Sequence, residues 1–375
     1  MKILKTCLSK SWGGLEMYAL QTVKQLIKHG VNAELLCYPD SRIYSEAISE
    51  GITTHTSKFN GYFHPFEIIK TSSLLKNNYD IIHCGASKDL WLIVPSLQLA
   101  NMNTPLILSK QMGSYIIKKD FLHKWIYKRL DYALAISSVI AKNLEETTPL
   151  TKNKILLLHN AIDTEKFNPE LINSTLVRKE FSIYDDEILI GMMARFSPGK
   201  GHEEFLYAAN DLIKKYDKIK FMIVGEASKG EEEYEKEIKI LAKRLGLNNK
   251  LIFTGFRKDT PEVLAAMDIF VFPSHAEAFG IALAEALSMG KPSVCSNSDG
   301  VLDIAVDGET SLLFEKQNWK DLSNKIEKLI LNPDLRIKFG KAARNRAIKL
   351  FDLEVFTKKL IDIYKRTIEE RSNRK

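Results

Sequence analysis

The sequence has little of what marks a secreted or membrane-spanning protein. Only four cysteines occur among 375 residues, and no two of them form a CxxC pair. No run of about 18 uninterrupted apolar residues is present, which excludes an ordinary membrane-spanning helix. The apolar run after Met1 is too short for a signal peptide and is typical of a first β-strand. We therefore expect a cytoplasmic protein with buried free thiols, and any membrane contact is expected to be peripheral, on the inner face.

Familiar nucleotide-binding signatures are absent as well. The sequence contains no Walker A pattern GxxxxGK(S/T), and the loop after its first predicted strand lacks a GxGxxG fingerprint. These absences argue against a P-loop protein and against an ordinary dinucleotide-binding domain. The basic residues form no recognisable nucleic-acid-binding module, so we expect no nucleic acid partner.

Positive charge is in excess, and the excess lies in the first half of the chain. Lysine and arginine number 54 against 47 aspartate and glutamate residues, which gives a formal net charge of +7. Residues 1–168 hold 20 basic and 14 acidic residues, whereas residues 169–375 hold 34 and 33. Two interpretations stay open: an anionic partner such as a lipid surface or a phosphorylated glycan, and a basic face that only keeps the protein soluble.

Short apolar runs alternate with segments of helical periodicity, the pattern of a parallel sheet with crossover helices. The clearest helix spans Leu15–His29, where apolar residues recur every three to four positions before Gly30. A polar break at Asp163–Asp186 is interpreted as a linker. The predicted strands are Lys2–Cys7, Asn32–Tyr38, Asp80–Cys84, Pro105–Ser109, Tyr132–Ser137 and Lys154–His159 before the break, and Glu187–Arg195, Lys220–Gly225, Lys250–Phe256, Asp268–Pro273 and Pro292–Asn297 after it.

Two such cycles predict an α/β protein with two doubly wound, Rossmann-like domains that face each other across a cleft. The expected domains are 1–165 and 166–354, and a C-terminal helix at about 355–375 is expected to pack back on the first. Sheets of this kind bind ligands beyond the carboxyl ends of their strands. Loops between a strand and the following helix are therefore the places to look for functional residues.

The richest of these loops runs from Phe272 into a helix that Gly280 opens. Exposed amides at a helix start suit phosphate or sugar oxygens. Glu277 lies in the loop and Glu285 lies in the helix, so the two carboxylates could hold hydroxyl groups on different parts of one elongated ligand. The alternative is that both are ordinary surface glutamates.

A second loop combines Arg195 at the end of a strand with Lys200 between Gly199 and Gly201. A guanidinium and an ammonium group five residues apart can converge on one diphosphate, and the glycines let the backbone approach it. A third loop joins the first strand to the first helix through Gly13-Gly14, where backbone amides could again meet a ligand. Each loop alone could be no more than a turn.

Together these segments resemble the retaining GT-B glycosyltransferases of family 4, also called glycosyl transferases group 1. Glu277 and Glu285 are separated by seven residues, as in the EX7E motif of that family, and Phe272-Pro273-Ser274 precedes them. The resemblance extends from residue 12 to beyond residue 310. It implies a GT-B fold and transfer of a sugar from a nucleotide-sugar, with no metal and no other cofactor.

The resemblance also implies roles for individual residues. The catalytic set is expected to be Arg195, Lys200 and Glu277, with the two cations neutralising charge on the leaving diphosphate. Glu285 is expected to bind the ribose hydroxyls. The remaining donor-binding positions are Gly13, Gly14, Gly201, Phe256, Arg257, Phe279, Gly280 and Ile281.

One position departs from the family pattern. Many relatives carry a histidine near the donor sugar, after the fifth strand of the first domain, whereas this chain has Lys110 and Gln111 there. Glutamine can donate to a sugar hydroxyl but does not titrate near neutral pH. Lys110 or Gln111 therefore takes this place near the donor sugar or acceptor, and His83 is a weaker candidate.

Residues 115–131 bear on the acceptor, because lysines alternate there with apolar residues at helical spacing. A basic amphipathic helix with a tryptophan suits an anionic membrane surface, although a helix packed on the core with solvated lysines has the same pattern. This stretch resembles bacterial lipopolysaccharide-core and surface-polysaccharide transferases. We therefore expect a hexosyl- or N-acetylhexosaminyltransferase that uses a UDP- or GDP-sugar and a glycan or glycolipid acceptor. The alternatives are a GT-B nucleotide-sugar epimerase and a non-catalytic protein that binds sugar nucleotides.

Overall fold

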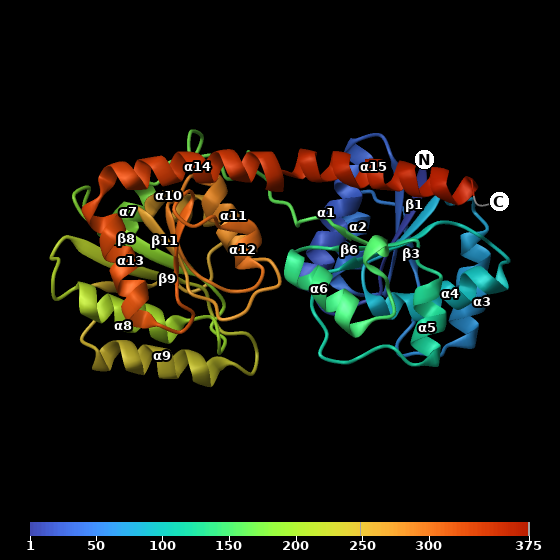
Figure 1. Ribbon diagram of the computed structural model, residues 1–375, viewed down its shortest axis with the longest axis horizontal. Coiled ribbons are helices and arrows are strands. Elements are labelled where there is room, and N and C mark those ends of the chain that lie inside the picture. The colour runs from blue at the N-terminus through green and yellow to red at the C-terminus, as the bar shows by residue number, and fades with distance from the viewer. Residues whose placement is uncertain (248, 374–375) are drawn as a thin grey trace. The chain divides into compact units, whose positions relative to one another are not determined.

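The computed structural model describes residues 1–247 and 249–373 and divides into two units (Figure 1). Unit 1 comprises Met1–His159 and Leu353–Lys375, and unit 2 comprises Asn160–Asp352. The last two residues of the helix expected at 355–375 lie outside the described residues. Each unit has its own sheet and its own covering helices, as the two alternating cycles of the sequence predict.

The described residues of unit 1 form a seven-stranded sheet in which all neighbouring strands are parallel. The strand order is β3-β2-β1-β4-β5-β6-β7, so the direction of winding reverses between β1 and β4. The central strands are buried on both faces, which explains their continuous apolar runs. Their bounds are β1 Lys2–Cys7, β2 Asn32–Cys37, β3 Thr54–Thr56, β4 Ile81–Cys84, β5 Leu106–Lys110, β6 Tyr132–Ala135 and β7 Ile155–Leu157.

Helices cover both faces of this sheet. Helix α1 packs against α2 and α15, and α3, α4 and α5 pack in succession on the opposite side (Figure 1). The bounds are α1 Gly14–Lys28, α2 Arg42–Ser49, α3 Pro65–Leu75, η1 Ser87–Asp89, α4 Leu90–Leu99, α5 Phe121–Lys128, α6 Ser138–Thr147, η2 Lys152–Lys154 and α15 Leu353–Ser372.

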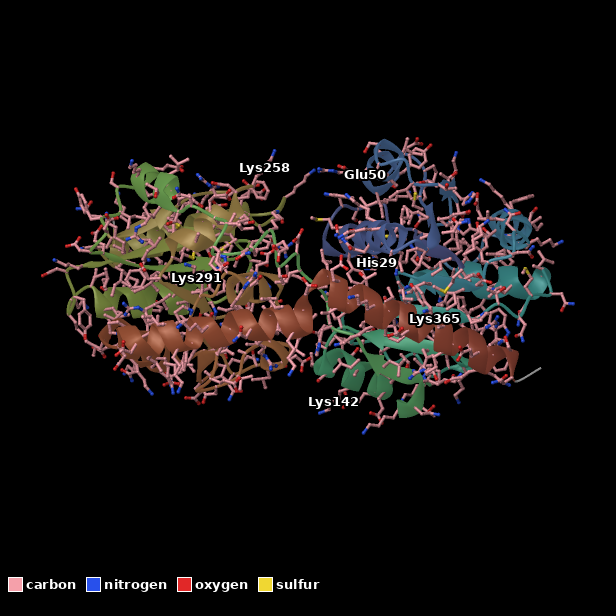
Figure 2. All side chains as sticks on the ribbon, turned by 90° about the horizontal axis from the view of Figure 1, so that it is seen from above. His29, Glu50, Lys142, Lys258, Lys291 and Lys365 are labelled. Carbon is pink, nitrogen blue, oxygen red and sulfur yellow. The ribbon has the colours of Figure 1, made fainter. Side chains whose placement is uncertain are left out.

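Helix α15 belongs to unit 1 although it is the last part of the chain. Figure 2 shows His29 beside this helix, where its ring nitrogen Nε2 lies 2.8 Å from a carboxylate oxygen of Glu354. Near the other end of α15, Arg371 forms an ion pair with Asp131 at 3.0 Å. Contacts at both ends therefore attach the final helix to the first sheet.

The described part of unit 2 contains a six-stranded parallel sheet with the order β10-β9-β8-β11-β12-β13. Its winding reverses between β8 and β11, the counterpart of the reversal in unit 1. The strands are β8 Ile188–Met193, β9 Ile219–Val224, β10 Leu251–Phe253, β11 Ile269–Phe272, β12 Ser293–Ser296 and β13 Ser311–Phe314.

In Figure 1, α8 and α9 lie below the second sheet, and α10, α11 and α14 lie above it. Phe205 from α8 packs edge-to-face on Phe221 from β9, which gives this side of the sheet a fully buried aromatic core. The helices are α7 Thr175–Glu180, α8 His202–Leu212, α9 Glu232–Arg244, α10 Thr260–Ala266, α11 Ile281–Ser288, α12 Val301–Ile304, α13 Trp319–Leu331 and α14 Pro333–Phe351.

The segment interpreted as a linker, 163–186, is instead an ordered part of unit 2. It contains α7, and Arg178 from that helix donates hydrogen bonds to the carbonyl oxygens of Ala266, Tyr184 and Glu187. The unit boundary also falls earlier than the expected residue 165, since Thr164 already donates a hydrogen bond to Asp352. The polar composition suggested a linker. The segment is ordered through side-chain hydrogen bonds of Arg178, and composition alone does not reveal such bonds.

The helix expected at 115–131 is shorter than the periodicity suggested. Only Phe121–Lys128 is helical, because the Asp120 carboxylate accepts hydrogen bonds from the amides of Leu122 and His123 and caps the helix there. The residues before Asp120 form an irregular segment. The basic and apolar side chains of the stretch therefore come from a loop and a short helix.

All four cysteines are free and buried, as the sequence predicts. Burial raises the pKa of the Cys37 thiol to about 12, which leaves it protonated at neutral pH. Among the described residues, no helix has both the length and the apolar character that crossing a bilayer requires.

Candidate active site

The predicted site residues of unit 2 lie on loops at the carboxyl edge of its sheet. Arg195 and Lys200 follow β8, and Glu277 and Gly280 follow β11. These two strands are hydrogen-bonded neighbours at the point where the winding reverses. A doubly wound sheet opens a crevice for ligands at such a point, because the helices after the two strands leave in opposite directions.

The β8 and β11 loops are locked together through their backbones. The amide of His275 donates to the carbonyl oxygen of Gly199 at 2.8 Å. Gly201 has a φ of +81°, and a Cβ atom there would lie 2.4 Å from the carbonyl oxygen of Pro273. Only glycine fits this position without displacing the neighbouring loop. The glycines around Lys200 thus hold the cationic loop against the acidic one.

Lys200 and Glu277 form an ion pair in this interlocked region. The Lys200 ammonium group donates to a Glu277 carboxylate oxygen at 2.5 Å, and neither side chain is more than about a quarter exposed. Two of the three predicted catalytic residues are therefore in direct contact, although 77 positions separate them in the sequence. In the absence of ligand, each provides the counter-charge of the other.

Arg195, the third predicted catalytic residue, is paired with a carboxylate that the sequence analysis did not single out. Its Nε atom lies 3.2 Å from Glu231, which also accepts a 2.6 Å hydrogen bond from the Ser197 hydroxyl. Glu231 is the N-cap residue of α9. It begins a run of acidic residues in the sequence, and such a run reads as a solvated helix face.

Glu285 lies on the second turn of α11, where its carboxylate is half-buried. Burial raises its pKa to about 7, and the charge of Lys166 only partly offsets this effect. Within the described residues no hydrogen bond or ion pair of this carboxylate is found. A half-buried acid without a partner is costly for the protein alone and is typical of a binding site.

Gly280 caps the same helix from the left-handed region, with a φ of +108°. This conformation turns the chain directly from the Glu277 loop into α11, so the first amides of the helix lie next to that loop. Phe279 is buried and its ring packs against Phe351, whereas the side chain of Ile281 is exposed. Phe279 could therefore contact a ligand only through its backbone.

The two donor-binding residues expected after β10, Phe256 and Arg257, differ in exposure and in their contacts. Phe256 is 62% exposed and free to cover a ligand ring. Arg257 forms ion pairs with both Glu180 and Asp259 at 2.6 Å, and these two hydrogen-bonded carboxylates raise its pKa. The Arg257 side chain thus has two anionic partners next to Phe256, and its contact with the donor stays a prediction.

Gly13 and Gly14 lie at the carboxyl edge of the other sheet, at the start of α1. The Gly13 amide donates to the Glu16 carboxylate at 2.8 Å. Apart from its chain neighbours and the backbone of its own helix, no atom lies within 4 Å of the place where a Gly14 Cβ would be. The space over this helix start is open, as an approach to a ligand by the backbone would require.

Lys110 is the last residue of β5 and Gln111 follows it, on the same edge. Gln111 shares a hydrogen bond with the Tyr18 hydroxyl, a group that burial makes a weaker acid. The Lys110 ammonium group reaches the Ser87 hydroxyl at 3.4 Å. A contact of Lys110 or Gln111 with the donor sugar or the acceptor stays a prediction.

The expectation for His83 is corrected by the structure. The side chain is fully buried, and its two ring nitrogens lie 2.6 Å from the Tyr364 hydroxyl and 2.7 Å from the Ser109 hydroxyl. Burial and the nearby charge of Lys5 lower its pKa well below the ordinary histidine value. His83 connects α15 to the sheet and does not face a ligand. Its position at a strand end was misleading because the side chain is buried against Tyr364 of α15.

Within the described residues, no group of three or more histidine, cysteine, aspartate or glutamate side chains gathers in a way that could hold a metal ion. The charged residues that the sequence predicted for the carboxyl edge of unit 2 are two cations, Arg195 and Lys200, and two acids, Glu277 and Glu285. Cations of this kind can neutralise a diphosphate, and the acids can accept hydrogen bonds from hydroxyl groups. These four residues therefore suit a ligand that carries a diphosphate and hydroxyl groups.

Two Rossmann-like units with this site make up the GT-B fold, and comparison with a solved structure agrees. A glycosyltransferase from Rickettsia africae ESF-5 matches with a TM-score of 0.87 at 23% identity, and the match covers 98% of both chains. The family profile for glycosyl transferases group 1 matches residues 173–346, and the profile for glycosyltransferase family 4 matches residues 12–166. The chain therefore belongs to the family 4 (group 1) glycosyltransferases and is an enzyme of that class.

Characterised relatives have similar lengths and moderate identities. The N,N'-diacetylbacillosaminyl-diphospho-undecaprenol alpha-1,3-N-acetylgalactosaminyltransferase of Campylobacter jejuni is 28% identical over 82% of this chain and 83% of its own. The UDP-Gal:alpha-D-GlcNAc-diphosphoundecaprenol alpha-1,3-galactosyltransferase of Escherichia coli is 27% identical over 78% and 76%. The capsular polysaccharide biosynthesis glycosyltransferase CapM of Staphylococcus aureus is 28% identical over 63% of this chain and 62% of its own.

Proposed function

We propose that this enzyme transfers a hexose or N-acetylhexosamine from a UDP- or GDP-sugar to a hydroxyl group of a lipid-linked glycan, with retention at the anomeric carbon and without a metal ion. The observation that carries the donor assignment is the Lys200–Glu277 ion pair, with Arg195 on the same loop and the unpartnered Glu285 on the adjoining helix. A nucleotide diphosphate sugar offers an anion for the two cations and hydroxyl groups for the two acids.

The reaction in this proposal needs few protein groups. The bond between the sugar C1 atom and the diphosphate oxygen breaks, and a bond from C1 to the acceptor oxygen forms on the same face of the ring. The acceptor proton passes to the departing diphosphate oxygen, so no protein base takes part. Arg195 and Lys200 would stabilise the charge that develops on the leaving group.

Donor binding requires the resting ion pairs to rearrange. A diphosphate that reaches Lys200 competes with Glu277, and one that reaches Arg195 competes with Glu231. Glu277, once released from Lys200, would accept hydrogen bonds from the donor sugar, and Glu285 would accept them from the ribose. The two ion pairs hold both cations in position before the donor arrives, and this lowers the entropic cost of binding.

Two findings support a lipid-linked acceptor. The two relatives from Campylobacter jejuni and Escherichia coli are named for acceptors linked to undecaprenol through a diphosphate. Unit 1 also exposes six large apolar side chains before and at the start of α5, which we call the apolar rim. They are Met112, Tyr115, Ile116, Ile117, Phe121 and Leu122.

Exposed apolar side chains next to Lys119 and Lys124 suit the interface of an anionic bilayer, where the apolar groups insert and the lysines meet lipid phosphates. We place the enzyme in the cytoplasm, at the inner face of the membrane. To test this, sedimentation with phosphatidylglycerol vesicles is compared for the parent, Ile116→Ser with Ile117→Ser, and the control Ile337→Ser. Ile337 is a similarly exposed residue of unit 2. Equal sedimentation of all three proteins would reject the membrane contact.

The donor assignment is tested with a thermal-shift panel of UDP-, GDP- and ADP-sugars in the presence of a chelator. We expect one base class to raise the unfolding temperature of the parent, and Arg195→Ala or Glu285→Ala to abolish the shift. No response to any nucleotide would end the donor assignment. Product analysis then separates transfer from epimerisation, because a glycoside forms only in the first case.

A further inference from the structure

The first turn of α8 contains His202, Glu203 and Glu204 and follows Gly201 directly. The site described above assigns no role to these three residues. His202 and Glu204 are nevertheless buried, with exposed fractions of 0% and 9%. Burial of a polar side chain destabilises a protein unless the side chain gains contacts in return. The contacts of this turn therefore indicate why polar residues stand there.

His202 supports the loop of Arg195 through an aromatic stack. Its ring lies nearly parallel to the ring of Phe196, with 4.5 Å between the centroids and 16° between the planes. Phe196 is the residue after Arg195, and it is 1% exposed. The Phe196 ring also contacts Phe253 of β10, with 6.2 Å between the centroids. The main chain next to Arg195 is thus held by buried rings, one of which belongs to the first residue of α8.

The imidazole of His202 acts there as a flat, uncharged ring. Neither ring nitrogen has a hydrogen-bond partner in the part of the chain that the structure describes. Burial and, to a smaller extent, the charge of Lys200 lower the pKa of His202 to about 4, so the ring is neutral at neutral pH. A neutral ring neither repels the cations of the site nor binds an anion in their place.

Glu203 connects the same turn to α9. Helices α8 and α9 lie side by side below the second sheet (Figure 1). The Tyr234 hydroxyl of α9 donates to the Glu203 carboxylate at 2.8 Å, and the Tyr234 ring meets the ring of His202 edge-on at 5.8 Å. Helix α9 begins directly after Glu231, the carboxylate partner of Arg195. The counter-ion of Arg195 is therefore connected to this turn as well.

Glu204 holds the loop of Glu277. Its carboxylate lies 2.9 Å from Nε2 of His275, which stands two positions before Glu277. The His275 amide donates to the carbonyl oxygen of Gly199, so this residue is fixed by its backbone and by its side chain. The other carboxylate oxygen of Glu204 is buried and has no hydrogen-bond partner among residues 1–247 and 249–373. The contact with His275 therefore accounts for the direction in which this carboxylate points.

We propose that the first turn of α8 holds the charged side chains of the donor site in their binding positions. His202 positions Arg195, and Glu204 positions Glu277. The inference rests on the proposed function, in which Arg195 contacts the diphosphate of the donor and Glu277 contacts its sugar. Because the two positioning residues act on different parts of one ligand, their substitution should change different measurements.

Three ligands separate these parts of the donor. For a uridine nucleotide they are uridine, UDP and the UDP-sugar that gives the largest thermal shift in the panel above; for another base they are the corresponding compounds. Calorimetric titration gives the affinity of each, with the weak nucleoside measured in competition with the diphosphate. The ratio of UDP to uridine affinity reports the diphosphate contact. The ratio of UDP-sugar to UDP affinity reports the sugar contact.

The diphosphate ratio tests His202. We expect His202→Val, which removes the flat ring, to lower this ratio by about tenfold, the effect of one weakened charge-assisted contact. His202→Phe keeps a ring of similar volume and should keep the ratio within about twofold of the parent. An unchanged ratio in His202→Val, or an equal loss in His202→Phe, would overturn the role of His202.

Phe205→Leu is the matched control for lost stability. Phe205 is fully buried in the same helix, but its ring packs on Phe221 of β9. This variant should lower the unfolding temperature, as a truncation in the core does, and leave both ratios within about twofold of the parent. A diphosphate ratio that falls as far as in His202→Val would mean that the ratio reports stability alone, and the proposal would fail.

The sugar ratio tests Glu204. Glu204→Met removes the hydrogen bond to His275 at nearly constant side-chain length, and we expect it to lower the sugar ratio by about tenfold while the diphosphate ratio is unchanged. Glu204→Gln retains an oxygen that can accept from His275 and should restore most of the sugar ratio. A sugar ratio that is normal in Glu204→Met would overturn the role of Glu204.

The parent protein separates this inference from the proposed function. If the parent binds none of the nucleotides, the proposed function is rejected and the inference with it. If the parent binds its nucleotide normally and both ratios are unchanged in His202→Val and Glu204→Met, the inference alone is rejected.

Discussion

The carboxyl edges of the two sheets differ in whether their cationic side chains contact a carboxylate. At the edge of unit 2, Arg195 and Lys200 each rest against a carboxylate, Glu231 and Glu277. At the edge of unit 1, the Lys110 ammonium group reaches the Ser87 hydroxyl and no carboxylate within the described part of the chain. The packing of the loops differs as well. The β8 and β11 loops are in close contact at Gly201, whereas the space over Gly14 is open.

The comparison shows two kinds of anion-binding site, one with cations already paired to carboxylates and one with an unpaired cation. Carboxylates of the protein hold Arg195 and Lys200 of unit 2 in position. An anion that replaces these carboxylates therefore binds with little loss of side-chain entropy. Within the described residues Lys110 of unit 1 forms no ion pair, so an anion that binds it displaces no carboxylate. The first arrangement suits a step that needs fixed geometry, and the second suits recognition.

The largest expected effect concerns the interlocked loops of unit 2. Gly201→Ala should destabilise this unit by more than about 3 kcal/mol, because its Cβ would overlap the Pro273 carbonyl oxygen and because φ is positive there. Gly199→Ala has a similar φ but an unobstructed Cβ and should cost only about 1 kcal/mol. Calorimetric unfolding measures both, and equal losses would mean that the overlap is relieved.

The same comparison predicts tolerance in unit 1. Gly14→Ala should change the unfolding free energy by less than about 0.5 kcal/mol, since no atom lies within 4 Å of its Cβ position and alanine favours a helix start. A loss as large as that of Gly201→Ala would show that the two edges are packed alike.

The next effect is on turnover. Arg195→Ala should lower kcat/KM by about a hundredfold, the typical result of removing one group that stabilises developing charge. Its stability should change little, because the Arg195 side chain is 55% exposed and such ion pairs contribute little. Steady-state kinetics and thermal unfolding measure the two quantities, and a large stability loss with normal turnover would contradict the assignment.

A smaller effect follows from the buried acid of unit 2. The pKa of Glu285 is raised from 4.5 to about 7, so between these pH values the folded protein binds more protons than the unfolded chain. The free energy of unfolding therefore falls as the pH rises through this window. Glu285→Gln removes the loss and should be more stable than the parent by about 2 kcal/mol at pH 8 and equal to it near pH 4.5.

Calorimetric unfolding at several pH values measures this difference, and Glu237→Gln on the exposed face of α9 is the control. A Glu285→Gln variant whose stability tracks the parent at every pH would show that the carboxylate is not desolvated without its ligand.

The smallest expected effect is on nucleotide affinity. If Glu231 competes with the donor diphosphate for Arg195, Glu231→Gln should tighten UDP binding by about two- to fivefold, since an exposed ion pair is worth under about 1 kcal/mol. Glu233→Gln removes a carboxylate that pairs with Lys236 on the same helix and should leave the affinity unchanged. Weaker UDP binding by the Glu231 variant would mean that this residue orients Arg195 rather than competing for it.

Much of the fold was predictable because strands and helices have different periods. The predicted strands correspond to eleven of the observed ones, but β3 and β13, of three and four residues, were missed. Strands of three or four residues contain too few positions for a reliable period, although β7 and β10, equally short, were predicted. The predicted helix at 115–131 failed for a related reason, since apolar spacing alone does not reveal the cap at Asp120.

The candidate site was predictable only in part. Motif spacing identified the loops of Arg195, Lys200 and Glu277, and it indicated Glu285. It did not indicate Glu231, whose partner is distant in sequence, and it suggested His83, whose side chain is fully buried. A side chain's partners depend on packing between remote segments, which a single sequence does not report.

By itself, the amino-acid sequence determined the alternation of strands and helices, the two-domain α/β class and the loops that carry the chemistry, because these follow from local periodicity and residue type. Only the tertiary structure decided which charges are paired. Lys200 meets Glu277 across 77 positions, while Lys110 reaches the Ser87 hydroxyl and no carboxylate within the described residues. Electrostatic interaction depends on distance and burial in space, and neither is encoded at any single position of the chain.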